Sequence, residues 1–377
     1  MSTYKSSGNR GRTIIRIIVK VILLLTIINF GWALIPDSVP AQINIYNWLV
    51  DGRVRFPFGE NPEHAYNLSL FNLDAMFASH EVDKLENDAE LRIILIGDSS
   101  IWGFLQKPEQ TLAGLLRQQH KDKDIGVYNL GYPSISILKD ALIIDYALQY
   151  EPDLVIWFTT LEALPTEKQL PTPIVANNAS KLKDIIGKYS LSNINPQQPS
   201  FLQRTFWAQR RNIFDIIRLQ FYGILWEATG IDQDYPDSYR EAQRDFPEPK
   251  LDFYGITAGQ ELRKILSIEV IESVIEKNSE VDFILVNEPI LVSEGENAHL
   301  QYNFYYPRWA YDTYREIINT FTAENGIKYY DLWNMVPEAE FTNSAIHLTA
   351  TGGKMLANTI NEIILEYLGE STKSNEE

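Results

Sequence analysis

Five short apolar runs, rich in β-branched and aromatic residues, lie between residues 91 and 333, and a small or polar residue follows each run. They cover residues 91–97, 125–131, 152–160, 281–289 and 327–333. Near-continuous apolar runs of this length are typical of strands that are buried on both faces of a sheet. The pattern therefore predicts five strands of one buried sheet.

Segments with helical spacing of their apolar residues separate these runs. They cover residues 112–120, 136–150, 259–278, 308–326 and 354–368. Strands that alternate with helices predict an α/β domain in which helices cover both faces of a parallel sheet, with right-handed crossovers.

The N-terminus has a different pattern. A basic tail, residues 1–13, precedes the apolar segment 14–36, which carries only two basic residues, both near its start. This segment is long enough to span a bilayer, and its positive flank should stay in the cytoplasm. We expect a single-pass signal-anchor in the cell membrane, with the rest of the chain extracytoplasmic. A cleaved signal peptide, with Val39 and Ala41 at the −3 and −1 positions, is the alternative.

Two further regions lie outside the strand–helix alternation. Residues 37–90 are rich in aromatics without a clean period, and we expect an extracytoplasmic wrap around the later domain. Residues 161–255 separate the third and fourth runs and are far too long for an ordinary connection, so they predict an inserted cap. The domain then consists of residues 91–160 and 256–370, and residues 371–377 form a disordered tail.

Composition narrows the functions that are open to the chain. Among its 377 residues there is no cysteine, which excludes disulfides, thiolate metal sites and a cysteine nucleophile. The net charge of −17 argues against a nucleic-acid partner. No two of the five histidines are four residues apart, so no helix-borne metal site is expected. We predict chemistry without a metal or an organic cofactor.

Candidate chemistry gathers where the predicted strands end. In open parallel sheets, ligands bind beyond the carboxyl ends of the strands. The residues found there, in chain order, are Ser99, Gly131, Thr160, Glu162, Asn287, Glu288 and Asp331, and His347 follows on a loop before the last helix. Ser99 is a candidate nucleophile, and His347 is the base that could activate it. The amides of Ser99 and Gly131 are candidates for an oxyanion hole.

Three sequence blocks resemble a known family. Ile-Leu-Ile-Gly-Asp-Ser ending at Ser99, Asn-Leu-Gly ending at Gly131, and Ile-His-Leu-Thr around His347 are similar to blocks of the SGNH (GDSL-type) hydrolase superfamily, here in a membrane-anchored form. The resemblance covers residues 91–160 and 281–368. It implies a flavodoxin-like three-layer α/β/α sandwich, a nucleophile at Ser99, an oxyanion glycine at Gly131 and a catalytic histidine at His347.

The third block departs from the family pattern. Where the family has Gly-x-Asn-Asp, this chain places Thr160 at the glycine and Glu162 at the asparagine. An ionised glutamate cannot donate a hydrogen bond to an oxyanion. The donor is then Thr160, a protonated Glu162, or Asn287.

The last block also departs from the pattern. The aspartate that normally precedes the histidine by three positions is replaced by Ser344, and Asn343 stands one position further back. Asn343 could orient the imidazole of His347 through its amide oxygen. Asp331 is a second candidate for that role.

Two functions follow from these observations. The first is an envelope-facing serine esterase or O-acyltransferase that acts on acyl esters of a cell-surface glycan, a lipid or a small molecule. In it Ser99 attacks, His347 acts as base and then acid, and Asn287, Glu288 and Glu162 are candidate substrate contacts. The second is a catalytically inactive, membrane-tethered carbohydrate-binding or assembly protein on the same fold, which the two departures favour.

Overall fold

A five-stranded parallel sheet forms the centre of the computed structural model, which describes residues 7–35, 45, 49, 52–58, 70–84, 89, 91–196, 199–229 and 239–374. The strands are β1 (Leu91–Ile96), β2 (Ile125–Asn129), β3 (Leu154–Thr159), β4 (Asp282–Asn287) and β5 (Lys328–Asp331). Their order across the sheet is β2-β1-β3-β4-β5, with every pair parallel. This is the flavodoxin-like order. It confirms the predicted fold class, and each strand lies inside a predicted run.

The register aligns the polar residues at the carboxyl ends of three strands. Thr159 pairs with Asn287 across β3 and β4, and Asn287 pairs with Asp331 across β4 and β5. On the other side of β3, Ile96 pairs with Trp157, so β1 ends slightly earlier and its chain turns out of the sheet at Gly97. The residues that the sequence singled out therefore share one edge of the sheet.

Helices cover both faces, as the alternation predicts. One face packs with α7 (Ile137–Ala147), α12 (Glu269–Glu276) and α13 (Arg308–Glu324). The other packs with α6 (Leu112–Gln119) and α14 (Ala350–Ser374). Successive β1 side chains divide between the two cores, because neighbouring residues of a strand point to opposite faces. The result is a three-layer α/β/α sandwich.

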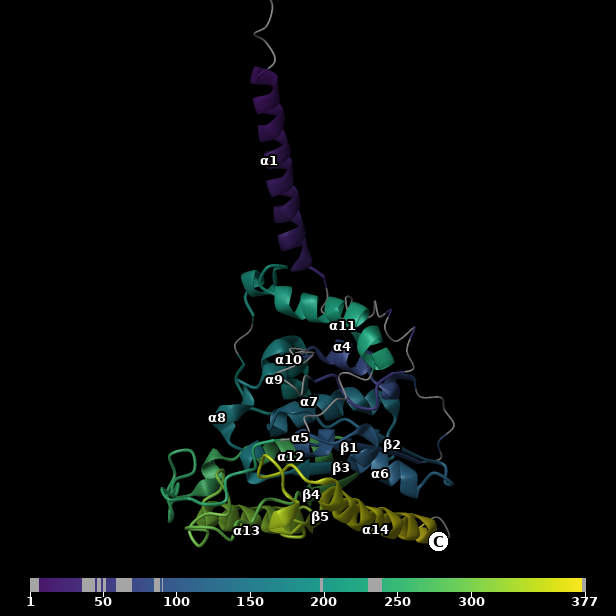
Figure 1. Cartoon of the computed structure of the whole chain (residues 1–377), viewed down its shortest axis with the longest axis vertical. Helices are drawn as coiled ribbons and strands as arrows, with labels where there is room; N and C mark the ends of the chain where they lie inside the picture. The colour runs from purple at the N-terminus through teal and green to yellow at the C-terminus, as the bar shows by residue number, and fades with distance from the viewer. Residues whose placement is uncertain are drawn as a thin grey trace, which may run out of the picture.

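Most helices of the insert extend the face that carries α7. They are α8 (Thr166–Gln169), α9 (Pro173–Asn177), α10 (Ala179–Lys188) and α11 (Arg210–Thr229). The apolar side of α10 joins the core around α7, and Figure 1 shows α9, α10 and α11 between the sheet and the N-terminal helix. Residues 239–255 run elsewhere: the Ala242 N–H donates to the Thr342 carbonyl at 2.9 Å, next to Asn343. Among the described residues of the predicted cap, this last part therefore runs beside the loop that carries Asn343.

The described part of the predicted wrap is ordered against the domain. It includes α4 (Leu73–Ala78), whose Met76 and Phe77 are fully buried with Phe56 in the α7 core. Short helices complete the chain: α5 (Ser99–Trp102), η2 (Glu81–Lys84), η3 (Pro108–Gln110), η4 (Leu148–Tyr150), η5 (Leu161–Ala163), η6 (Phe201–Arg204), η8 (Leu262–Ile265) and η9 (Glu338–Glu340).

The N-terminal helix α1 (Ser7–Trp32) extends away from the domain, at the opposite end of the molecule from α14 (Figure 1). Its segment Gly11–Trp32 spans 22 residues and contains an 18-residue stretch with a mean hydropathy of 2.3, none of which is buried in the protein. Such a helix is compatible with a single-pass membrane anchor or a signal sequence. Most of residues 36–51, which include Val39 and Ala41, lie outside the described residues.

Two predicted boundaries were wrong. The expected helix over 259–278 is divided into η8 and α12, because Leu266 bridges Pro165 and the Ser267 N–H donates to the Leu164 carbonyl at 2.8 Å. The predicted tail is helical as far as Ser374, since α14 continues past residue 370. Residues 375–377 lie outside the described part of the chain.

Candidate active site

Ser99 stands at the start of α5, immediately after the turn that leaves β1. Asp98 caps this helix, because its Oδ1 accepts a hydrogen bond of 2.8 Å from the Ser100 N–H. As the first residue of the helix, Ser99 has an N–H without an intrahelical acceptor. The helix ends after one turn at Gly103, whose φ of 88° is in the left-handed region that favours glycine. Local sequence thus presents both the hydroxyl and the amide of Ser99 at the sheet edge.

A continuous hydrogen-bond chain joins Ser99, His347 and Asn343. His347 Nε2 lies 2.7 Å from Ser99 Oγ, and His347 Nδ1 lies 2.8 Å from Asn343 Oδ1. Because the amide oxygen of Asn343 can only accept, Nδ1 carries the proton and Nε2 is free to accept the serine proton. The structure therefore brings together three residues that are 248 and 4 positions apart in the sequence.

The surroundings of His347 keep its imidazole neutral. Its ring stacks on Phe104 with 4.6 Å between centroids, and only 8% of the residue is exposed. Burial lowers the pKa of His347 from 6.5 to about 3, because the charged form loses its hydration. The imidazole is thus unprotonated at neutral pH, which is the state that a general base requires.

Two residues fasten the C-terminal end of α5, and sequence reasoning missed both. Arg55, from the predicted wrap, donates through Nη1 to the Gly103 and Gln106 carbonyls at 3.0 and 3.1 Å and stacks over Trp102. Asn129, the last residue of β2, donates to the Ile101 carbonyl at 2.8 Å. Positive and amide donors suit the carbonyl end of a helix. They hold the loop that carries Phe104 against the imidazole.

Gly131 packs directly beneath α5. A Cβ atom at this position would lie 2.6 Å from the Trp102 backbone nitrogen, so no larger residue fits. The Gly131 N–H donates to Asn129 Oδ1 at 3.1 Å. Close packing thus explains the glycine, and the amide predicted for the oxyanion hole already has a partner inside the protein.

Thr160 and Glu162 are bound to neighbouring side chains. The Thr160 hydroxyl is fully buried, 3.0 Å from the Tyr306 hydroxyl. Glu162 Oε1 accepts from Lys168 Nζ at 2.8 Å and from the Tyr254 hydroxyl at 2.6 Å. Burial, together with the contact to Glu162, raises the pKa of Tyr254. The Glu162 carboxyl is therefore engaged by two donors of its own surroundings.

Asn287 and Asp331 belong to a separate polar network. Asn287 donates to Asp331 Oδ1 at 2.8 Å and accepts from the Tyr311 hydroxyl at 3.1 Å. Asp331 also accepts from Arg315 Nη2 at 2.7 Å. The expectation that Asp331 supports His347 is therefore corrected, since Asn343 occupies that position. Asn287 is fully buried, so it is placed neither as a substrate contact nor as an oxyanion donor.

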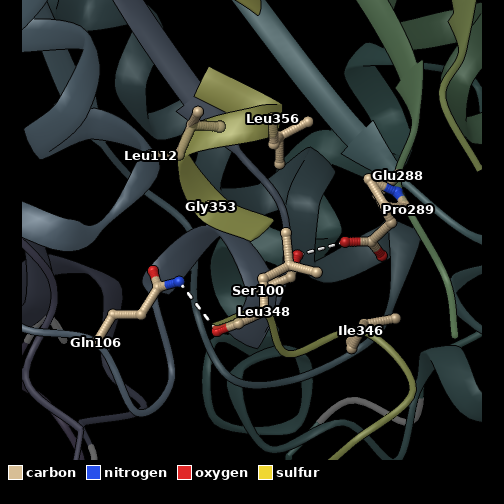
Figure 2. Close-up of a pocket in the computed structure, with 9 residues that line it drawn as sticks. All are labelled: Ser100, Gln106, Leu112, Glu288, Pro289, Ile346, Leu348, Gly353 and Leu356. Atoms are coloured by element: carbon tan, nitrogen blue, oxygen red, sulfur yellow. Dashed lines mark hydrogen bonds between the residues drawn. The ribbon is translucent and has the colours of Figure 1, made fainter. Parts of the chain in front are cut away.

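Glu288 lies behind the candidate nucleophile and not in front of it. Its Oε2 accepts a short hydrogen bond from the Ser100 hydroxyl (Figure 2). These two residues border a cavity of about 10 Å³, which is also lined by Gln106, Leu112, Pro289, Ile346, Leu348, Gly353 and Leu356. That volume holds at most one water molecule, so Glu288 is not positioned as a substrate contact.

The carboxyl of Glu288 shares its surroundings with that of Asp98. Burial raises the pKa of both groups, and the Asp98 charge raises the pKa of Glu288 further. Glu288 is thus favoured in its protonated form behind α5. Sequence reasoning had only its place after β4 to judge from, which does not reveal on which side of the chain the carboxyl lies.

The arrangement can perform nucleophilic chemistry without further groups. It contains a hydroxyl, a neutral imidazole that accepts from it, and an amide oxygen that orients the imidazole, which is the logic of a serine triad. Within the described ranges no three histidine, aspartate or glutamate side chains gather where they could hold a metal ion.

No model of a known protein family matches the chain, and no curated protein sequence is significantly similar to it. Solved structures resemble it at low identity. A G-D-S-L family lipolytic protein from Desulfitobacterium hafniense is 13% identical with a TM-score of 0.37, over 73% of this chain and 99% of that one. A carbohydrate acetylesterase family member from Sinorhizobium meliloti is 12% identical with a TM-score of 0.35, over 74% and 100%.

The aryl esterase of M. smegmatis is 13% identical with a TM-score of 0.34, over 73% of this chain and 99% of that one. The first of the three is described as a member of the G-D-S-L family, which is the family that the sequence blocks resemble. At these identities and TM-scores the likeness carries no conclusion about activity, which has to come from the site itself.

Proposed function

We propose that this protein is a serine esterase that cleaves carboxylic acyl esters. The observation that carries the proposal is the chain from Ser99 Oγ through His347 to Asn343 Oδ1, with contacts of 2.7 and 2.8 Å. A serine that only formed the first residue of a helix would not need a buried, neutral histidine on its hydroxyl. Ser99 is only 9% exposed, so the residue is largely shielded from water.

In the proposed reaction, Ser99 Oγ attacks the acyl carbonyl carbon while its proton passes to His347 Nε2. The tetrahedral intermediate then collapses, the bond from carbon to the alcohol oxygen breaks, and the alcohol leaves with that proton. A water molecule, or an acceptor hydroxyl in a transferase, next gives its proton to His347 and attacks the acyl-serine. Ser99 recovers its proton from the imidazolium as the acid or the new ester departs.

The amide of Ser99 is the donor we assign to the oxyanion, because it is the first N–H of α5 and has no acceptor within that helix. A second donor has to come from Gly131 or Thr160. Gly131 would share its N–H with Asn129 Oδ1, and Thr160 would release Tyr306. Either donor comes at the expense of an existing hydrogen bond.

We further propose that the domain acts at the outer face of the cell membrane on O-acylated glycans. The basic tail of residues 1–13, ahead of the apolar segment, favours a cytoplasmic N-terminus, which would leave everything after Trp32 outside. An ester on a surface polymer is a substrate class that a membrane-held enzyme can reach. The acyl-serine intermediate is the same in both cases, whether water or a sugar hydroxyl then accepts the acyl group.

A second candidate function is a catalytically inactive, membrane-tethered binding or assembly protein. The neutral Asn343 beside His347 and the ion pair between Glu162 and Lys168 favour it. An imidazolium formed during catalysis would lack a carboxylate partner, and no glutamate proton would help the oxyanion. The two functions differ in whether Ser99 acts as a nucleophile in ester cleavage.

Replacement of Ser99 by alanine tests the esterase. With an aryl acetate as substrate, we expect Ser99→Ala to lower kcat by roughly 10⁴-fold or more, as loss of a triad member does, with an unchanged melting temperature. The matched control is Ser100→Ala, one residue along the same helix, which should retain most of the activity. Wild-type turnover in Ser99→Ala would reject the esterase, and a silent wild-type protein would favour the binding function.

A further inference from the structure

Helix α11 is apolar along two separate stripes. Ile213 is buried, and Ile216 and Ile224 pack against the core of the domain. A second stripe contains Phe214, Ile217, Phe221 and Leu225, at the spacing of one helix face. This second stripe points to solvent: Phe221 is 71% exposed and Leu225 is 58% exposed.

The exposed stripe continues into the segment before the helix. Leu202 is 66% exposed and Trp207 is 70% exposed. We refer to Leu202, Trp207, Phe214, Ile217, Phe221 and Leu225 together as the α11 surface. A contiguous group of exposed apolar side chains marks a surface that contacts another protein or a membrane.

The α11 surface adjoins the end of the helix that is long enough to span a membrane. Phe30 of α1 stacks on Phe201 with 6.0 Å between ring centroids, and the Trp207 N–H donates to Asn29 Oδ1 at 2.9 Å. Figure 1 shows α11 lying across the foot of α1, between α1 and the sheet. If Gly11–Trp32 spans a bilayer, Asn29 lies near one membrane–water interface. The segment that contacts Asn29 then lies at the same interface.

The charge of this segment suits a lipid surface. Residues 201–229, which extend to the end of α11, contain four arginines, Arg204, Arg210, Arg211 and Arg218, and two acids, Asp215 and Glu227, so their net charge is +2. The whole chain carries −17. A basic segment on an otherwise acidic protein attracts anionic headgroups, and Trp and Phe side chains prefer the depth of the headgroups.

We propose that α11 is an interfacial helix that lies in the headgroup layer beside α1. The lipid surface covers the apolar stripe, and the exposed Arg204 and Arg210 reach the lipid phosphates. The domain is then held to the bilayer at two places, the span and α11. One span leaves a domain free to swivel, whereas a second contact fixes which side of the sheet faces the membrane. The proposal rests on α1 as a membrane span, and not on the esterase chemistry.

Site-specific spin labels test the proposal on the full chain, which contains no native cysteine that would have to be removed first. Nitroxide labels on Phe221→Cys and Leu225→Cys are compared with a label on Leu365→Cys, after reconstitution into vesicles of phosphatidylcholine and phosphatidylglycerol. Leu365 is a matched control, because it is 42% exposed on α14, at the far end of the molecule (Figure 1). Collision rates with oxygen and with a water-soluble nickel chelate report the depth of each label.

We expect the labels at 221 and 225 to collide more often with oxygen than with nickel, as a label on Leu24→Cys in α1 does. The label at 365 should show the reverse. Equal nickel access at 221, 225 and 365 would overturn the proposal, since the stripe would then face water. Labels at 221 and 225 that reach neither reagent would also overturn it, because a protein partner would then cover α11.

Discussion

The carboxyl edge of the sheet contains two regions that look alike in sequence and differ in structure. At the end of β1, Ser99 meets His347 from a distant loop, and its hydroxyl lies against a base. At the ends of β4 and β5, Asn287 donates to Asp331, and Asp331 also accepts from Arg315. Both regions place polar residues after buried strands, but the first pairs a nucleophilic hydroxyl with a neutral imidazole and the second does not.

The difference lies in how completely the polar groups are satisfied. Asn287 is fully buried, and both its amide nitrogen and its oxygen have partners within the protein, so it serves to hold β4, β5 and α13 together. Ser99, in contrast, has one partner for its proton and an amide at the open end of a helix. An active site needs a donor that is left free for the substrate, such as the Ser99 N–H, whereas a structural network does not. Changes in the first region should therefore alter rates, and changes in the second should alter stability.

Among the residues that surround His347, Asn343 is the one whose replacement should change kcat most. Asn343→Leu should lower kcat by roughly 10–100-fold, because the imidazole of His347 loses the hydrogen bond that orients it. Asp331→Asn is the matched control from the other region and should leave kcat within about two-fold. Steady-state hydrolysis of one aryl ester by both variants measures the contrast. Equal losses would contradict the separation of the two regions.

The charge of the supporting group sets the pH dependence. The pKa of His347 is lowered to about 3 by burial, so the base stays neutral and the rate should hold as the pH falls well below 6.5. In Asn343→Asp a carboxylate would favour the imidazolium, so the pKa of His347 should rise and the acidic limb of kcat/KM should move toward neutral pH. At neutral pH the activity should be preserved or raised. An unmoved limb would mean that another group titrates.

The smaller effect is a change in stability at Asn287. Asn287→Leu removes the amide oxygen to which the buried hydroxyls of Tyr311 and Tyr314 donate. We expect the free energy of unfolding to fall by about 2–3 kcal/mol, the cost of buried polar groups left unsatisfied. The kcat of the protein that remains folded should be unchanged. Denaturant unfolding measures the change in stability, and activity assays at low denaturant measure kcat. A lower kcat with an unchanged free energy of unfolding would place Asn287 in the active site.

Sequence patterns predicted the sheet well, because each strand is a run of apolar residues bounded by polar ones. They did not show that Leu266 would break a helical period, since the cause is contact with Pro165, about a hundred residues earlier. Tertiary pairing of this kind leaves no local trace in the sequence.

The site was predictable where spacing and residue type are specific. Ser99, His347 and Asn343 were named in advance, and the structure places them in contact. Arg55 was missed, because a buried arginine in an aperiodic aromatic segment resembles a surface residue until its carbonyl acceptors on α5 are known. Phe104 was missed for a similar reason, since nothing in the sequence indicates that it stacks on His347.

Covalent labelling of the wild-type protein with a fluorophosphonate probe tests the central claim most directly. The probe reacts with a serine whose hydroxyl is activated by a neighbouring base. We predict a single adduct, mapped by mass spectrometry to Ser99, that is absent in Ser99→Ala and strongly reduced in His347→Gln. An adduct on another serine, or no adduct on a folded protein, would contradict the assignment of Ser99 as the nucleophile.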